Sequence, residues 1–210
     1  WRNPTLDHNG GSNDWLGLSN SDRQLPSSFP NKRLVRGGIY TPEVGVSQAE
    51  LEQLGESLPN QWTPSLVNGR PNQSFSTSYG DRIGKFGFSG SLSHSYSQDY
   101  TEEDQVYYSL DEVGSLAPFS TYDYRVGSAK GSLSALVNAA FAATPNNRVT
   151  FQVFSTDKSK RETRTFEGYN DDATRNLRNS RLLHQEESLR SFQFGGDHFL
   201  PGLSSSRIEW

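Results

Sequence analysis

Beyond residue 70, several stretches of the chain alternate apolar and polar positions with a period of two. In the stretch 84–96 the even positions include Phe86 and Leu92, while the odd positions carry only Lys, Gly and Ser. In the stretch 131–143 every odd position from Leu133 onward is apolar. This period predicts β-strands that present one apolar face and one face of polar or small residues.

Turn residues divide these strands into hairpins. Pro145 fixes φ and Asn146 tolerates a left-handed conformation, so the segment 144–147 predicts a tight turn. Short connections are expected at 80–83, 144–147 and 200–204, and long connections at about 98–126 and 156–181. The strands themselves are expected within 72–97, 127–156 and 182–210.

The first 70 residues show no such period. They are rich in Gly, Pro, Asn and Ser, which favours irregular structure, and one short helix is expected from Ser47 to Leu58. Ser47 is the expected N-cap of that helix and Glu50 stands at its third position, as in a capping box. We therefore expect a long irregular loop with a short helix at 1–70, followed by a partial barrel wall of five to six antiparallel strands at 71–210.

Long strands joined by alternating short and long connections are typical of a transmembrane β-barrel, whose apolar face meets lipid. The predicted fold is an all-β, antiparallel, up-and-down transmembrane β-barrel segment with long external loops. The alternative is a soluble β-sandwich, which carries the same alternation on strands of about 5–6 residues. The residues expected to face lipid are Phe86, Phe88, Leu92, Leu133, Val137, Phe141, Val149, Phe151, Val153, Phe192 and Phe194.

Composition limits the classes of protein that fit the chain. Only 32% of the 210 residues are hydrophobic, too few for a conventional two-layer core, while 12% are aromatic, which argues against disorder. A net charge of −4 gives no indication of a nucleic-acid partner. The chain has no Cys, so disulfides and thiolate metal sites are excluded. It has no Met either, and the lack of an initiator residue leads us to expect an internal piece of a longer precursor.

Nine short motifs, in their order along the chain, are similar to one family. They are Asp14-Trp15-Leu16-Gly17, Asp22-Arg23-Gln24-Leu25-Pro26, Phe75-Ser76, Tyr79-Gly80-Asp81-Arg82, Gly84-Lys85-Phe86-Gly87-Phe88, Glu162-Thr163-Arg164, Glu167-Gly168-Tyr169-Asn170, Gly195-Gly196-Asp197-His198 and Ser206-Arg207-Ile208-Glu209-Trp210. The chain resembles an early barrel segment of TonB-dependent outer-membrane receptors, in particular those with a carboxypeptidase-regulatory-like N-terminal extension.

This resemblance implies a location in the bacterial outer membrane and contact with its lipid. It implies energised uptake of a scarce nutrient, such as a siderophore, an oligosaccharide or a peptide. It also implies partners outside this chain, namely further barrel strands, a plug domain and TonB.

Tyrosines gather in the segment predicted as the second external loop. Tyr combines an apolar ring with a hydroxyl group, which suits stacking on a sugar ring or a peptide and equally suits an aromatic belt at the membrane interface. The candidate ligand-binding residues in the external loops are Tyr100, Tyr107, Tyr108, Tyr122, Tyr124, Arg161, Arg164 and Glu167.

No cluster of acid, base and nucleophile indicates an enzyme, so we expect neither catalytic residues nor a cofactor. The four histidines, His8, His94, His184 and His198, are far apart in the sequence, and no metal site is expected from them. The alternative function is a soluble or secreted β-rich binding module, in which the same tyrosines would recognise carbohydrate.

Overall fold

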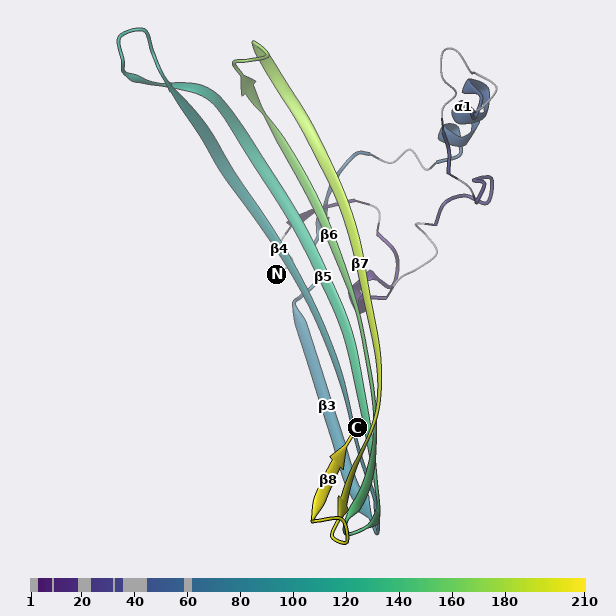
Figure 1. Ribbon diagram of the computed structural model, residues 1–210. Coiled ribbons are helices and arrows are strands. Elements are labelled where there is room, and N and C mark those ends of the chain that lie inside the picture. Colours follow the sequence, from purple (N-terminus) through teal and green to yellow (C-terminus); the bar gives the residue numbers. More distant parts are fainter. Residues whose placement is uncertain (1–3, 9, 19–23, 32, 36–44, 59–61) are drawn as a thin grey trace.

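A computed structural model describes residues 4–8, 10–18, 24–31, 33–35, 45–58 and 62–210 of the chain. Two antiparallel sheets make up most of its regular structure, and the larger one (Figure 1) lies where the period-two alternation predicts strands. Asp22 and Arg23, which belong to the second motif of the family resemblance, lie outside the described residues. In the part of the chain that is described, no helix has the length and apolar character needed to cross a membrane.

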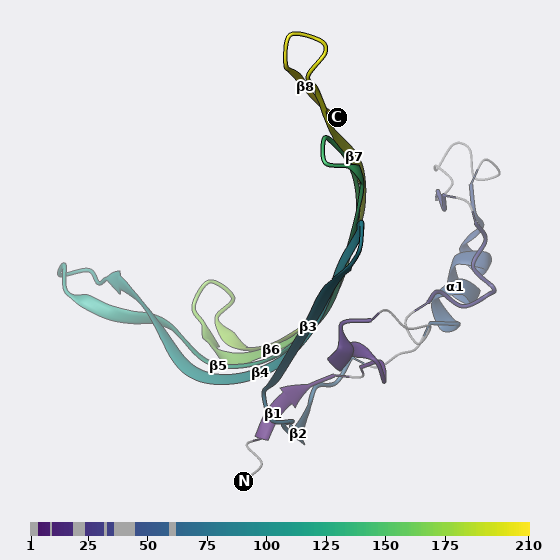
Figure 2. The same ribbon diagram turned by 90° about the horizontal axis from the view of Figure 1, so that it is seen from below.

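The larger sheet is a six-stranded meander in which each strand pairs antiparallel with the next along the chain. Its strands are β3 (Gln73–Ile83), β4 (Phe86–Leu110), β5 (Leu116–Thr144), β6 (Asn147–Asn170), β7 (Arg175–Leu200) and β8 (Ser206–Glu209). Within the described residues the sheet does not close into a barrel, because β3 and β8 are its two edges. Seen from below, the sheet is strongly bent (Figure 2).

The prediction of long external loops is wrong. The segment 98–126 forms the outer halves of β4 and β5, which continue as one hairpin to a turn at 111–115. In that turn the Asp111 carboxylate accepts hydrogen bonds from the backbone N–H groups of Val113 and Ser115. The segment 156–181 likewise belongs to β6 and β7, apart from a turn at 171–174.

These outer halves were missed because polar residues lie on both of their faces. Without an apolar face there is no hydrophobic period to detect, yet the register set by the inner half of each hairpin continues along the same strands. The first short turn also differs from the predicted 80–83. It lies at Gly84 and Lys85, where Gly84 adopts a φ of +60°.

Strand register sorts the side chains onto two faces, since residues opposite each other on neighbouring strands share a face. One face, here the Phe face, has the rows Phe86–Phe141–Val149, Phe88–Ala139–Phe151–Phe194 and Gly90–Val137–Val153–Phe192 next to the short turns. The other, here the Ser face, has rows such as Ser89–Asn138–Gln152–Gln193. All eleven residues expected to face lipid lie on the Phe face.

The rows of the Phe face from Phe86 to Leu92 form what we call the apolar band. Much of it is exposed, with relative exposures of 71% for Phe192, 64% for Phe194 and 52% for Val137. The buried hydrophobic residues in the described part of the chain are Leu6, Val46, Leu54, Tyr96 and Tyr122. These five do not supply a core beneath the band.

The apolar band ends at a pair of charged residues. Arg190 lies in the same row as Leu92, one row beyond Phe192. Its guanidinium donates hydrogen bonds of 3.0 and 2.9 Å to the two carboxylate oxygens of Asp157. Asp157 also accepts a hydrogen bond of 2.6 Å from the hydroxyl of Ser188.

The N-terminal part, here the described residues before Gln73, contains a strand pair that was not predicted, β1 (Pro4–Asp7) with β2 (Ser65–Asn68), and a short 3-10 helix, η1 (Asp14–Leu16). Of these elements, β1 and η1 pack against the Phe face. The expected helix is present as α1 (Gln48–Glu56), and Ser47 Oγ accepts a hydrogen bond of 3.2 Å from the Glu50 N–H. In Figure 2 this part lies on the convex side of the bent sheet.

Two glycines of β5 let the N-terminal part approach the sheet. A Cβ atom on Gly127 would collide with the backbone of Leu6, and one on Gly131 would lie 2.8 Å from the carbonyl oxygen of Trp15. The ring of Trp15 packs edge-to-face on His94, with centroids 5.2 Å apart. Because His94 lies one row beyond Leu92, the N-terminal part crosses the Phe face just beyond the apolar band.

Candidate functional site

The predicted ligand-binding residues lie on strands rather than in loops, and they divide between the two faces. Tyr107, Tyr122 and Tyr124 gather on the Ser face. Tyr100 and Arg161 lie on the Phe face, so the sequence-based set does not form a single site.

The residues on the Ser face form an aromatic cluster of Tyr107, Tyr122, Tyr124 and Phe166. Phe166 lies directly opposite Tyr124, and the two rings stack with centroids 4.9 Å apart. Tyr122 packs edge-to-face on Phe166 at 5.3 Å, on Tyr124 at 6.2 Å and on Tyr107 at 6.0 Å. Phe166 was missed because it was assigned to a loop, where no partner strand would bring it beside Tyr124.

Polar groups surround this cluster. The hydroxyl of Tyr122 accepts a hydrogen bond of 2.6 Å from the side-chain amide of Asn170. Burial raises the pKa of Tyr124, and the neighbouring Tyr107 and Tyr122 raise it further, while Arg164 opposes them. Tyr124 is therefore neutral at physiological pH and can donate a hydrogen bond. Apolar rings with hydroxyl groups at their edge suit a ligand that has a flat apolar face and polar substituents, such as a sugar ring.

The other predicted residues take up separate positions. Arg164 contacts Glu162 at 3.5 Å, and Glu167 is exposed and lies 3.9 Å from Arg178. Tyr108 lies beyond a register shift, opposite Pro118, and is 60% exposed.

Tyr100 is on the Phe face, where its hydroxyl donates to the carboxylate of Glu102. Burial raises the pKa of Tyr100, and the hydrogen bond to Glu102 adds to that increase.

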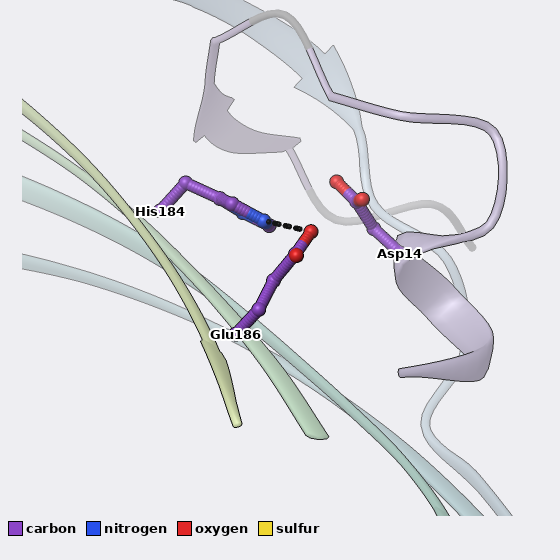
Figure 3. Close-up of side chains that lie close together, drawn as sticks. All are labelled: Asp14, His184 and Glu186. Atoms are coloured by element: carbon purple, nitrogen blue, oxygen red, sulfur yellow. Dashed lines mark hydrogen bonds and ion pairs between the residues drawn. The ribbon is translucent and has the colours of Figure 1, made fainter. Parts of the chain in front are cut away.

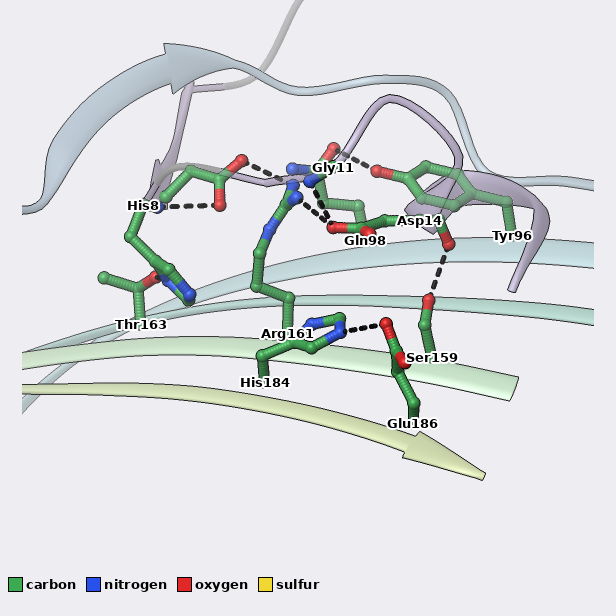
Figure 4. Close-up of polar contacts among 11 residues, drawn as sticks. His8, Gly11, Asp14, Tyr96, Gln98, Ser159, Arg161, Thr163, His184 and Glu186 are labelled. Carbon is green, nitrogen blue, oxygen red and sulfur yellow. Dashed lines mark hydrogen bonds and ion pairs between the residues drawn. The ribbon is translucent and has the colours of Figure 1, made fainter. Parts of the chain in front are cut away.

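Arg161, a predicted ligand contact, forms ion pairs within the chain. Its guanidinium lies 2.7 Å from the carboxylate of Asp7 and 2.8 Å from that of Asp14, and its side chain is only 14% exposed (Figure 4). Ser159 adds a hydrogen bond of 2.6 Å from its hydroxyl to the carbonyl oxygen of Asp14. Arg161 thus fastens both β1 and η1 to β6.

A cavity of about 350 Å³ lies between the N-terminal part and the sheet. Its lining includes Asp7, Asp14, Arg70, Tyr96 and Arg161, so it is polar and carries charges of both signs. Burial raises the pKa of Tyr96, although the nearby Arg161 and Arg70 lower it.

A group of possible metal ligands adjoins this cavity. Asp14, His184 and Glu186 each offer one ligand atom, and these atoms lie within 4.8 Å of one another (Figure 3). Part of this arrangement could be predicted from the sequence. His184 and Glu186 are two residues apart on a strand, so their side chains share a face. The approach of Asp14 was not predictable from the sequence, since it depends on the docking of η1.

The fold and these sites define an all-β protein with an open antiparallel sheet, an exposed apolar band and an aromatic cluster on the opposite face. Comparison with known proteins finds no matching family model, no matching curated protein and no matching solved structure.

Proposed function

We propose that the chain is a wall segment of a TonB-dependent receptor in the bacterial outer membrane, which takes up a scarce nutrient. The observation that carries this proposal is the exposed apolar band on one face of strands whose other face is mainly polar or small, apart from Leu136 and Phe154. A water-soluble protein rarely leaves such a patch of large apolar side chains uncovered. Lipid is the environment in which exposed Phe192, Phe194 and Val137 are favourable.

The apolar band covers part of the height of a membrane. From Phe86 to Leu92 the chain advances six residues, which is about 20 Å along a strand. At the usual strand tilt this corresponds to a height of about 15 Å, compared with about 25 Å for the apolar belt of transmembrane barrels. Beyond the band the strands continue with polar residues on both faces, as expected for a wall that projects into water.

The aromatic cluster gives the proposed receptor a place to contact its ligand. It lies on the Ser face, which would line the lumen if the Phe face meets lipid. The same proposal assigns the open edges at β3 and β8 to the remaining barrel strands. A plug domain and TonB, outside this chain, would complete the transport machinery, and the segment itself would catalyse no reaction.

The aromatic cluster also favours the second candidate function, a soluble or secreted module that binds carbohydrate. Stacked Tyr124 and Phe166 would serve a sugar ring equally well in either protein. The two functions differ in what covers the apolar band, since a soluble module needs a protein partner there and a receptor needs lipid.

Site-directed spin labelling of single cysteines distinguishes the two functions, because the chain has no cysteine of its own. The test variants are Phe192→Cys and Val153→Cys on the Phe face. The matched variants, Gln193→Cys and Gln152→Cys, lie one residue away on the same strands but on the Ser face. The full protein would be reconstituted in lipid vesicles, and each label's exposure to oxygen and to a water-soluble nickel chelate measured.

The receptor function predicts that labels at 192 and 153 collide preferentially with oxygen, which concentrates in lipid. Labels at 193 and 152 should collide preferentially with the nickel chelate. Equal exposure to the chelate at all four positions, or a protein that stays in the aqueous fraction without detergent, would rule out the receptor.

A further inference from the structure

Asp14, His184 and Glu186 come together from two distant parts of the chain, and this arrangement does not depend on the receptor proposal. His184 and Glu186 lie on the Phe face of β7, and Asp14 begins η1. The imidazole Nε2 of His184 is 2.8 Å from a carboxylate oxygen of Glu186. We propose that these three side chains bind one divalent transition-metal ion, with Zn²⁺ as the best fit.

The distances are close to those of a metal site. Zn²⁺ binds His nitrogen at about 2.0–2.1 Å and carboxylate oxygen at about 2.0–2.2 Å, so two ligand atoms at the tetrahedral angle lie about 3.4 Å apart. The 2.8 Å between His184 and Glu186 is within about 0.6 Å of that separation. The three ligand atoms lie within 4.8 Å of one another, so side-chain shifts of up to about 1.4 Å would bring all three onto one ion.

The surrounding charge favours a cation. Among the described residues that form the group or line the adjoining cavity, the carboxylates of Asp7, Asp14 and Glu186 outnumber the guanidinium groups of Arg161 and Arg70. Glu186 is exposed, so an ion can enter from solvent.

The ligand types select the kind of ion. One imidazole and two carboxylates suit Zn²⁺ and related transition metals, whereas Ca²⁺ takes oxygen ligands alone. Three protein ligands leave a fourth position for water.

Supporting hydrogen bonds hold Asp14 in place. The Gly11 N–H and the Arg161 guanidinium both donate to Asp14 Oδ2, at 3.0 and 2.8 Å. A carboxylate has two oxygens with several lone pairs, so it can accept these bonds and also bind an ion. An ion at this position would join η1 to β7. The ion pairs of Arg161 instead join β1 and η1 to β6.

Isothermal titration of the full protein in detergent with ZnCl₂, after treatment with EDTA, tests the site. We expect one ion per chain, with His184→Gln and Glu186→Gln each weakening binding by at least about tenfold. The matched controls are His198→Gln, a histidine near the short turns, and Glu187→Gln, the next residue on β7 but on the Ser face. Both controls should bind as the wild type does.

Two further readouts separate a metal ligand from a structural residue. Co²⁺ in place of Zn²⁺ should give a visible absorption spectrum that changes in His184→Gln and not in His198→Gln. Zn²⁺ should also slow proteolysis of the N-terminal part in the wild type and in both controls, but not in His184→Gln or Glu186→Gln. The proposal is overturned if the wild type binds no Zn²⁺, or if His184→Gln and Glu186→Gln bind it with unchanged affinity while circular dichroism shows that they are folded.

Discussion

The guanidinium of Arg161 lies 2.8 Å from the carboxylate of Asp14, a residue 147 positions earlier in the chain. The same guanidinium lies 2.7 Å from Asp7, so one side chain on β6 holds two points of the N-terminal part. Few apolar contacts support this docking, since Leu6 is the only hydrophobic residue of β1 or η1 among those that are buried in the described chain. We infer that ionic and hydrogen-bonding groups position the N-terminal part.

Replacing Arg161 by Ala should release β1 and η1 from the sheet. The substitution removes the Arg161 cation from two carboxylates of low exposure, and hydrogen bonds to charged groups contribute about 1.5–3 kcal/mol each. Hydrogen exchange of residues 4–17 should rise sharply while exchange in the inner halves of β4 to β6 stays unchanged.

Arg164→Ala is the matched control for this change. Arg164 lies on the same strand, but its side chain is 41% exposed and 3.5 Å from Glu162, an arrangement that contributes about 1 kcal/mol at most. Equal effects of the two substitutions on residues 4–17 would contradict the positioning role of Arg161.

Gly127→Ala should displace β1 without altering the charges. A Cβ atom at this position would meet the backbone of Leu6, including its carbonyl carbon at 2.8 Å, and backbone atoms cannot move aside cheaply. We expect proteolytic cleavage in the N-terminal part about tenfold faster, equivalent to about 1.4 kcal/mol of lost docking free energy. Gly87→Ala is the control, because a Cβ there meets nothing within 4 Å, and its cleavage rate should match the wild type.

Tyr122→Phe should loosen the turn at 171–174. The Tyr122 hydroxyl accepts from the Asn170 side chain, and Asn170 in turn accepts from the Ala173 N–H at 2.7 Å. Loss of the hydroxyl should cost about 1 kcal/mol and raise hydrogen exchange at Ala173. Tyr169→Phe removes a hydroxyl from a ring that is 42% exposed and should leave the turn unchanged, and a similar effect of both variants would refute the link.

Glu162 should make the folded state sensitive to acid. Its hydrogen bond to Lys160 lowers the pKa of Glu162, burial opposes this, and the charges of Lys160, Arg164 and Arg181 lower it further. Since the pKa is lower in the folded than in the unfolded state, the stabilisation is complete above the unfolded value of about 4.3 and is lost as pH falls below it. Glu162 lies outside the apolar band, because it is seven residues along β6 from Ser155, which belongs to the last row of the band.

Denaturant unfolding at pH 7 and at pH 3.5 checks this expectation. The wild type should lose more stability than Glu162→Gln between these two values, because the variant has no carboxyl group to protonate at this position. If the two proteins lose the same amount, Glu162 does not contribute to the acid sensitivity.

The alternation of the sequence predicted the inner halves of the strands well. One face of each strand is apolar in this region. The register of the sheet puts these apolar residues on a common face, among them Phe86, Leu133, Phe151 and Phe194. The turn at Pro145 and the cap at Ser47 were also predictable, since both depend on local conformational preferences.

Features that depend on distant parts of the chain were not predictable in this way. Residues 98–110 have no apolar face, so their place in β4 follows only from pairing with β5. The contact of Arg161 with Asp14 and the approach of Asp14 to Glu186 arise only when the N-terminal part docks. For the same reason the stacking of Phe166 on Tyr124 becomes evident only once β5 and β6 are paired.

The Arg190–Asp157 pair at the end of the apolar band would fix the insertion depth of the proposed receptor. Sliding the wall inward by one row, about 7 Å along a strand, would carry the guanidinium of Arg190 toward hydrocarbon. A charged Arg on the lipid side of a barrel costs about 2–4 kcal/mol at the midplane and less near its edges. Sliding it outward would instead hydrate Phe192, so in the proposed receptor two adjacent rows of β7 would encode the vertical position of the wall in the bilayer.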